Sequence, residues 1–273
     1  MTEASERFKA TVFEPKGCLA SLAEQFNSVP HYLFRTSSPR STGITTENYV
    51  ELAAVKHGIN RDDILGRERQ TVVEMLRGYL TWMNLWDDNL TSWTSLFLFA
   101  VQHAIRSYNE PELILISILD TRKAPRGSFL PVVALLKAYG IKSKDKLRHE
   151  YYNAEYLSQG LMDWSDPAVS DAVVTTTLGK LISHGLYDLY PPFANAAERE
   201  KLFKRVRQLR TTFLYAPSTP TPAEISYAEK ISIGCFHKDK IRPVIMMILL
   251  SLKHRYRMDT DILEAFKKNG WGR

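Results

Sequence analysis

Cysteine is scarce in this sequence. Cys18 and Cys235 are the two cysteines, they stand far apart, and neither belongs to a CxxC pair. This spacing excludes a disulfide framework and a zinc site built from thiolates. The seven histidines form no HExxH motif or other close pair of metal ligands, so we expect no dedicated metal site. So few thiols suit a reducing compartment.

Long apolar runs are also missing. The longest, VIMMILLSL from Val244 to Leu252, is well short of the ~20 residues that cross a bilayer. It therefore predicts a buried helix and no membrane span. The N-terminal stretch MTEASERFKATVFEPKGCLASLAEQFNSVP contains acids and proline and lacks the apolar core of a secretory signal. We therefore expect a soluble intracellular protein, cytoplasmic or nuclear.

The composition is that of an ordinary globular protein, with 44% hydrophobic and 24% charged residues. A chain of 273 residues can form one main core and a smaller extension. The basic charge is uneven: residues 1–195 hold 20 Lys and Arg against 22 Asp and Glu, and residues 196–273 hold 16 against 8. The net charge of +6 therefore comes from the C-terminal part. A basic segment attracts nucleic acid, an acidic protein or an anionic surface, although a solvated helical face has the same composition.

Hydrophobic periodicity and turn residues predict a mixture of helices and strands. We expect an amphipathic stretch at 11–26 and a strand after Pro30. The remaining expected elements are helices at 47–58, 61–86 and 95–108, a strand at 113–122, a strand passing into a short helix that Gly140 ends, a turn and a helix after Gly160, a basic amphipathic helix at 196–215, and further helices at 223–273.

Three short blocks along the chain carry the functional prediction. YLFRTSSPR places Arg35 on the early strand, TSWTS groups Ser92, Thr94 and Ser95 before a helix, and YNAEYLSQG places Glu155 near a strand entry. Taken singly, each block has a plain explanation: an ion pair at a strand end, a helix N-cap, and a surface acid. Their order along the chain is what makes them informative.

In this order the blocks resemble the Arg, Ser-Thr-Ser and Glu motifs of cholera- and pertussis-toxin-type mono-ADP-ribosyltransferases. The segments FAVQHA and ILISILDTRKAPRGSFLPVVALLKAYG share the resemblance, and the chain also resembles a fungal family of unknown function that carries these blocks. The resemblance implies an α+β fold, an ADP-ribosyltransferase-like split β-sandwich of two packed sheets with flanking helices. It predicts a helical lead-in at 1–30, the transferase-like domain at 31–192, and a basic helical C-terminal extension at 193–273.

The resemblance also implies a chemistry, in which NAD is a substrate and its nicotinamide–ribose bond is cleaved through an oxocarbenium-like state. Glu155 matches the catalytic Glu, which offsets the developing positive charge as carboxylates do in glycoside cleavage. Arg35 matches the residue that organises the NAD phosphates, and Arg40 matches a second basic position. Ser92, Thr94 and Ser95 match the hydroxyl motif that braces the Glu, and the acceptor of ADP-ribose would be a protein or a nucleic acid.

Two positions depart from the family pattern. Trp93 interrupts the hydroxyl motif; it could stack on nicotinamide or belong to the core. Asn153 stands where active members have Glu or Gln, so acceptor activation is open: the chain could transfer ADP-ribose, hydrolyse NAD, or be inactive. Two other classes therefore remain, a silent relative that binds and signals, and a nucleic-acid-binding module that uses residues 196–273. The sequence does not indicate an oligomeric state.

Overall fold

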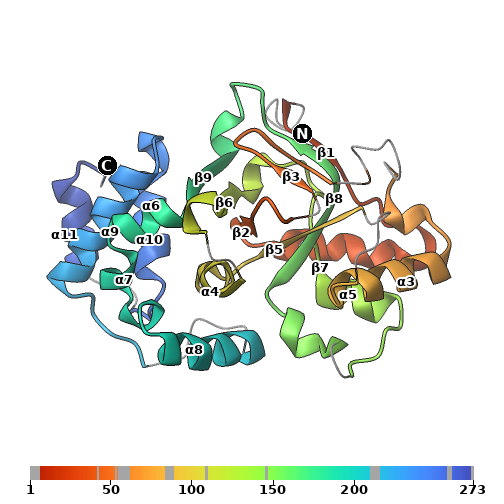
Figure 1. Ribbon diagram of the computed structural model, residues 1–273. Helices are drawn as coiled ribbons and strands as arrows, with labels where there is room; N and C mark the ends of the chain where they lie inside the picture. Colours follow the sequence, from red (N-terminus) through yellow and green to blue (C-terminus); the bar gives the residue numbers. More distant parts are fainter. Residues whose placement is uncertain are drawn as a thin grey trace. The chain divides into compact units, whose positions relative to one another are not determined.

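The computed structural model describes residues 7–41, 43–52, 54, 62–83, 89–107, 110–144, 147–209, 216–256 and 260–271. The chain divides into two units, coloured by sequence in Figure 1. The first comprises Met1–Ser95 and Ile118–Val173, and the second comprises Leu96–Ser117 and Val174–Arg273. Both helices and strands are present, which confirms the mixed α and β class. Among the described residues, no helix is long and apolar enough to cross a membrane.

The first unit is built on a curled antiparallel sheet. Its central strand is β8 (Glu155–Asp163), and the path through the unit is β3-β4-β8-β5-β2-β6, while β1 and β7 also pair with β8. The bounds of the other strands are β1 Lys9–Thr11, β2 Tyr32–Ser37, β3 Ile44–Thr45, β4 Tyr49–Glu51, β5 Leu90–Thr94, β6 Leu115–Asp120 and β7 Leu130–Pro131. From β6, Ile118–Asp120 belong to this unit.

Gly160 lets β8 bend and change its neighbours. N-terminal to it the strand pairs with β5 and β7, and C-terminal to it Met162 pairs with β4 and β1. Gly160 has φ +66, and a Cβ there would lie 2.8 Å from the Cβ of Thr11, so only glycine suits this place. We expected the chain to turn after Gly160; instead the strand continues to Asp163, because this bend does not end the ladder.

Two hydrophobic cores lie on opposite faces of this sheet. One packs Leu90 and Leu157 against helices, and the other contains Trp93 and Tyr156. The division follows from the alternation of side chains along a strand. The helices that contribute to the first core are η1 (Gly17–Ser28), α3 (Arg69–Leu80) and α5 (Val132–Ala138). Gly140, at φ +68, follows α5 as predicted.

Two expected elements of this unit are different in the structure. The helix expected at 47–58 is wrong at its start, because residues Tyr49–Glu51 form β4 and Val50 pairs with Met162 of β8. Ala54 is helical, and residues 53 and 55–58 lie outside the described residues. The expected helix at 61–86 is shorter: η2 (Ile64–Gly66) precedes α3, and residues 84–86 lie outside the described residues. Glu68 caps α3 by accepting the Gln70 and Thr71 amides.

The second unit is largely helical. The N-terminal half of β6 lies next to β9 (Val173–Thr177), and a Ser117–Thr175 hydroxyl pair at 3.1 Å joins them. The helices are α4 Phe97–Ser107, α6 Leu178–Ser183, α7 Leu186–Leu189, α8 Ala196–Leu209, α9 Pro222–Cys235, α10 Arg242–Leu250 and α11 Thr260–Lys268. The helices expected at 95–108 and after residue 196 are confirmed as α4 and α8, although residues 210–215 lie outside the described part. We missed β9, which the sequence reading placed within a turn and helix.

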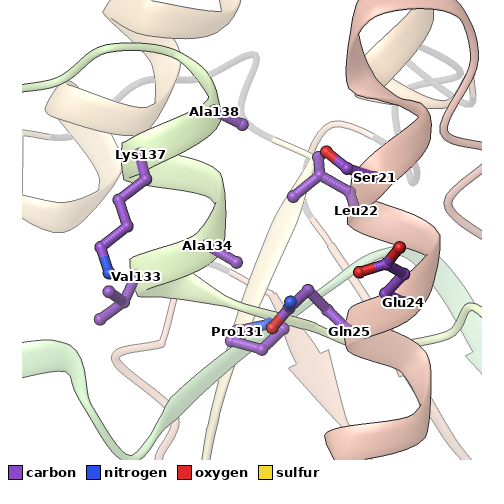
Figure 2. Close-up of a pocket in the computed structure, with 9 residues that line it drawn as sticks. All are labelled: Ser21, Leu22, Glu24, Gln25, Pro131, Val133, Ala134, Lys137 and Ala138. Atoms are coloured by element: carbon purple, nitrogen blue, oxygen red, sulfur yellow. The ribbon is translucent and has the colours of Figure 1, made fainter.

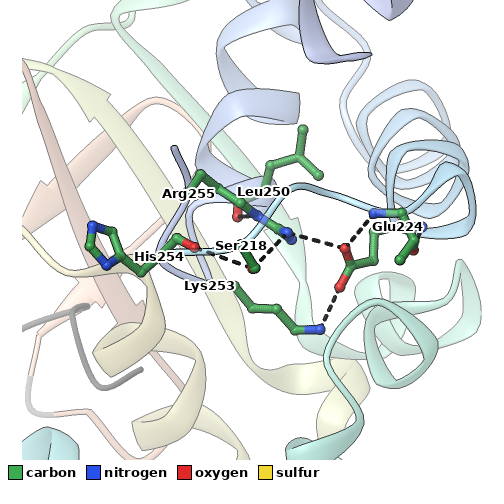
Figure 3. Close-up of polar contacts among 7 residues, drawn as sticks. Ser218, Glu224, Leu250, Lys253, His254 and Arg255 are labelled. Carbon is green, nitrogen blue, oxygen red and sulfur yellow. Dashed lines mark hydrogen bonds and ion pairs between the residues drawn. The ribbon is translucent and has the colours of Figure 1, made fainter. Parts of the chain in front are cut away.

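A buried carboxylate organises the C-terminal helices. Glu224 closes a capping box with Thr221 at the start of α9, and its carboxylate also pairs with Lys253 and with the Arg255 Nη1 at 3.1 Å (Figure 3). Ser218 donates its amide to the His254 carbonyl at 3.0 Å. The segment preceding α9 and the segment following α10 are therefore tied to the same acid.

Candidate functional site

The strand register brings the predicted acid and hydroxyl blocks together. Thr94 of β5 lies opposite Glu155 of β8, and Ser92 lies opposite Leu157. Side chains two residues apart leave a strand on the same face. Ser92, Thr94 and Glu155 therefore share one face of the sheet, the face that α3 covers.

A chain of hydroxyl groups ends on the Glu155 carboxylate. The Tyr79 hydroxyl of α3 donates to the Ser92 Oγ at 3.0 Å, and the Ser92 hydroxyl donates to the Glu155 Oε1 at 2.7 Å. All three side chains are half-buried. A hydroxyl-to-carboxylate bond of this length is charge-assisted and stronger than a neutral one. Glu155 is thus held in position by residues from two other elements.

Arg35 contacts the same strand from β2. Its Nη1 donates to the Ser92 carbonyl at 3.1 Å, and its Nε lies 3.4 Å from the Thr45 Oγ1 of β3. Strand β2 is paired with β5 through Phe34 opposite Thr94. The three predicted blocks therefore lie on three adjacent strands, with Ser92 in contact with both charged residues.

The other two residues of the hydroxyl motif are Thr94 and Ser95. Thr94 is buried, and Ser95 donates its amide to the Ala154 carbonyl at 2.9 Å. This bond fixes the backbone immediately before Glu155. Of the hydroxyl block, Ser92 is therefore the side chain that contacts the acid in the described hydrogen bonds.

Trp93 is a core residue. It is 1% exposed, it donates its indole N–H to the Ser158 Oγ at 2.9 Å, and it packs edge-to-face on Phe129 at 5.8 Å. Strand alternation directs it away from the Ser92 face. An indole so enclosed has no surface to offer a ligand, so Trp93 belongs to the core and does not stack on nicotinamide.

Asn153 and Arg40 are exposed positions near the ends of elements. Asn153 follows the short helix η6 (His149–Tyr152) and stands two residues before Glu155. Arg40 lies between β2 and β3, where its amide donates to the Ser38 Oγ at 3.2 Å. The structure gives neither side chain a described partner that identifies a role.

Sequence reasoning missed Tyr79. Tyr79 lies in the stretch predicted as a helix, and nothing in the sequence relates it to a serine 13 residues later. The end of α3 is held near β8 by Tyr152, whose hydroxyl donates to the Leu80 carbonyl at 3.0 Å. Only the packing of α3 on the sheet could have identified Tyr79.

A hollow of this unit lies away from these residues. It has a volume of about 500 Å³ and lies between η1 and α5, with Leu22, Pro131 and Ala134 on its apolar wall and Glu24 and Lys137 at its rim (Figure 2). The residues described as lining it do not include Glu155 or Ser92. The acid and its hydroxyl partners therefore form a site defined by hydrogen bonds and not by this hollow.

Part of the chain is similar to a known protein family. The family described as "Domain of unknown function (DUF7587)" is similar to residues 28–161, a range that contains Arg35, Tyr79, Ser92 and Glu155. No curated protein and no solved structure matches the chain. The match therefore covers the whole hydroxyl–carboxylate chain but supplies no activity.

Proposed function

We propose that the protein cleaves the nicotinamide–ribose bond of NAD and transfers ADP-ribose to a macromolecular acceptor. The observation that supports this proposal is the Tyr79–Ser92–Glu155 hydrogen-bond chain, with Arg35 bound to the main chain of Ser92. The sequence blocks that resemble the ADP-ribosyltransferase motifs supply the residues that meet here. The resemblance and the contacts both point to Glu155 as the central acid.

The chemistry that we propose uses the fixed carboxylate. When the bond between the ribose C1′ and nicotinamide breaks, nicotinamide leaves with the bonding electron pair and positive charge develops on the ribose. A carboxylate held in place lowers the energy of that charge without having to reorganise. Ser92 holds one oxygen of Glu155 and so fixes its direction. The acceptor nucleophile then forms the new bond at C1′ and loses a proton.

The residues fit the two ends of NAD by their chemistry. A carboxylate with a hydroxyl neighbour suits the ribose of the nicotinamide end, where hydroxyl groups and developing positive charge are found. Arg35 and Arg40 are permanently charged guanidinium groups that suit the phosphates. We also propose the finer fold, the split β-sandwich of the transferase family, which the curled sheet and the adjacency of β2, β5 and β8 support.

The experiment measures nicotinamide release from NAD by the intact chain, with and without cell extract as a source of acceptor. Glu155→Gln keeps the shape and removes the charge, so release should fall at least ~100-fold. Glu150→Gln is the matched control, because Glu150 is exposed, lies in the same segment, and pairs only loosely with Arg148 at 3.9 Å. Equal turnover in the two variants would remove Glu155 from the proposed role.

Asn153 favours a second candidate, a silent relative that binds without catalysis. Its side chain is shorter than the Glu or Gln expected at that position and cannot act as a base. In the same assay this candidate predicts NAD binding by calorimetry with no nicotinamide release in the wild-type chain. Release that cell extract does not stimulate would instead indicate hydrolysis, with water as the acceptor.

A further inference from the structure

A second hollow in the first unit has a basic lining. It has a volume of about 290 Å³ and lies between the segment before β2 and the segment after β6. Asn27, His31, Arg122 and Arg126 contribute polar groups to it, and Phe26 and Phe129 belong to its apolar wall. A concave site with an apolar wall and a few convergent polar groups is the usual form of a small-molecule site, and this volume is at the lower end of the range.

Arg122 is held rigidly at this hollow. Its Nε and Nη2 donate to the two oxygens of Asp120, each at 2.8 Å, and its Nη2 also donates to the Tyr32 hydroxyl at 3.0 Å. The guanidinium lies over the Tyr32 ring at 5.6 Å. The Asp120 carboxylate is buried, whereas Arg122 is about half exposed. The direction of this guanidinium is therefore fixed before any ligand arrives.

Arg126 is also positioned, but by neutral groups. Its Nη2 donates to the Asn27 Oδ1 at 3.2 Å, and its guanidinium lies over the Phe26 ring at 5.6 Å. Among the residues that the structure describes, it forms no ion pair with a carboxylate. Its charge is not neutralised locally.

The charges around the hollow leave a net positive site. Asp120 offsets Arg122, and the neighbouring Lys123 pairs with Asp171 at 2.6 Å. The charge of Arg126 remains. An anion that entered the hollow would meet two guanidinium groups, and the charge of one of them, Arg126, is uncompensated.

We propose that this hollow binds a small phosphorylated molecule. A phosphate offers three acceptor oxygens and close to two negative charges, which suits paired guanidinium groups better than the single charge of a carboxylate. The rest of the ligand would lie against the Phe26 and Phe129 wall, in a space suited to a molecule of about the size of a sugar phosphate. None of these residues belongs to the Tyr79–Ser92–Glu155 chain, so the proposal does not rest on the proposed function.

The test titrates the intact chain with ribose 5-phosphate, inorganic phosphate and acetate, by calorimetry and by NMR. We expect saturable 1:1 binding of ribose 5-phosphate, and Arg126→Gln should weaken it about tenfold or more, the effect of losing a charge-assisted hydrogen bond. Arg69→Gln is the matched control: Arg69 also stacks on a ring, that of Tyr139 at 5.3 Å, and donates to the Ala138 carbonyl, but it does not line the hollow.

The comparison of ligands and variants makes the outcome decisive. Equal affinity for ribose 5-phosphate and inorganic phosphate would show that the phosphate group alone is bound. Tighter binding of ribose 5-phosphate would show that the apolar wall also contacts the ligand. Glu155→Gln should bind as the wild type does, which separates this site from NAD cleavage. Absence of saturable binding, equal affinity for acetate, or equal weakening in Arg126→Gln and Arg69→Gln would overturn the proposal.

Discussion

The hydroxyl of Ser92 should stabilise the first unit through two hydrogen bonds that meet at one atom. Ser92→Ala removes the bond to Glu155 and also the acceptor of the Tyr79 hydroxyl. A bond to a charged group contributes about 1.5–3 kcal/mol and a neutral one about 0.5–1.5 kcal/mol. Because all three side chains are half-buried and water replaces part of each bond, the low ends of these ranges apply. The expected loss in the free energy of unfolding is about 2 kcal/mol.

The hydroxyl of Tyr79 allows a second test of the same hydrogen-bond chain. Tyr79→Phe removes the neutral bond to Ser92 and leaves the Ser92–Glu155 bond in place, so it should cost about 0.5–1 kcal/mol. The double variant should then cost little more than Ser92→Ala alone, because the Tyr79 bond has already been lost. Groups in one hydrogen-bond network are non-additive in this way, whereas distant groups add.

Urea unfolding followed by tryptophan fluorescence measures these effects. Four of the five tryptophans belong to the first unit, so the signal reports mainly on the unit that contains the site. The slope against urea should stay constant while the midpoint falls. Strict additivity of the two changes, or an unchanged midpoint in Ser92→Ala, would refute the hydrogen-bond chain.

Three further predictions concern the packing. Gly160→Ala should lower the free energy of unfolding by about 2 kcal/mol or more, since it combines a left-handed backbone with a clash on Thr11; urea midpoints check this. Burial opposes ionisation of Glu224, but hydrogen bonds from its partners outweigh it and lower its pKa below 4.5. The ionised Glu224 therefore stabilises the folded chain above pH 4.5, and this stabilisation is lost as the pH falls through the lowered pKa. In Glu224→Gln the free energy of unfolding should fall less steeply with decreasing pH, which acid unfolding curves measure. Burial raises the pKa of Cys235 to about 11, so a thiol reagent at pH 8 should modify the exposed Cys18 and reach Cys235 only after unfolding.

Local patterns predicted the elements whose stability is mainly local. Helix α4 follows from apolar residues at helical spacing, and the end of α5 follows from Gly140, the residue type that a left-handed helix end favours. Strand β6 follows from its β-branched run. In each case the signal lies within about ten residues.

The failures have two causes. Residues 49–51 have a helical pattern but form a strand, because Val50 pairs with Met162, more than a hundred residues away. There, pairing with a distant strand overrides local propensity. The VVTTT segment forms β9 beside β6 and not part of a helix, and its run of β-branched residues is a local strand signal that the expected turn and helix did not take into account.

The sequence by itself determined the candidate residues. The order of Arg35, the hydroxyl block and Glu155 was sufficient to nominate an acid and its helpers, since residue type and order are properties of the chain. The tertiary structure decided which of them meet. The register of β5 on β8 placed Ser92 beside Glu155 and enclosed Trp93, and the packing of α3 added Tyr79. The approach of two distant segments placed Phe26 and Asn27 beside Arg122 and Arg126 at one hollow. Distances between groups far apart in the chain depend on how strands pair and helices pack, and only the folded chain specifies them.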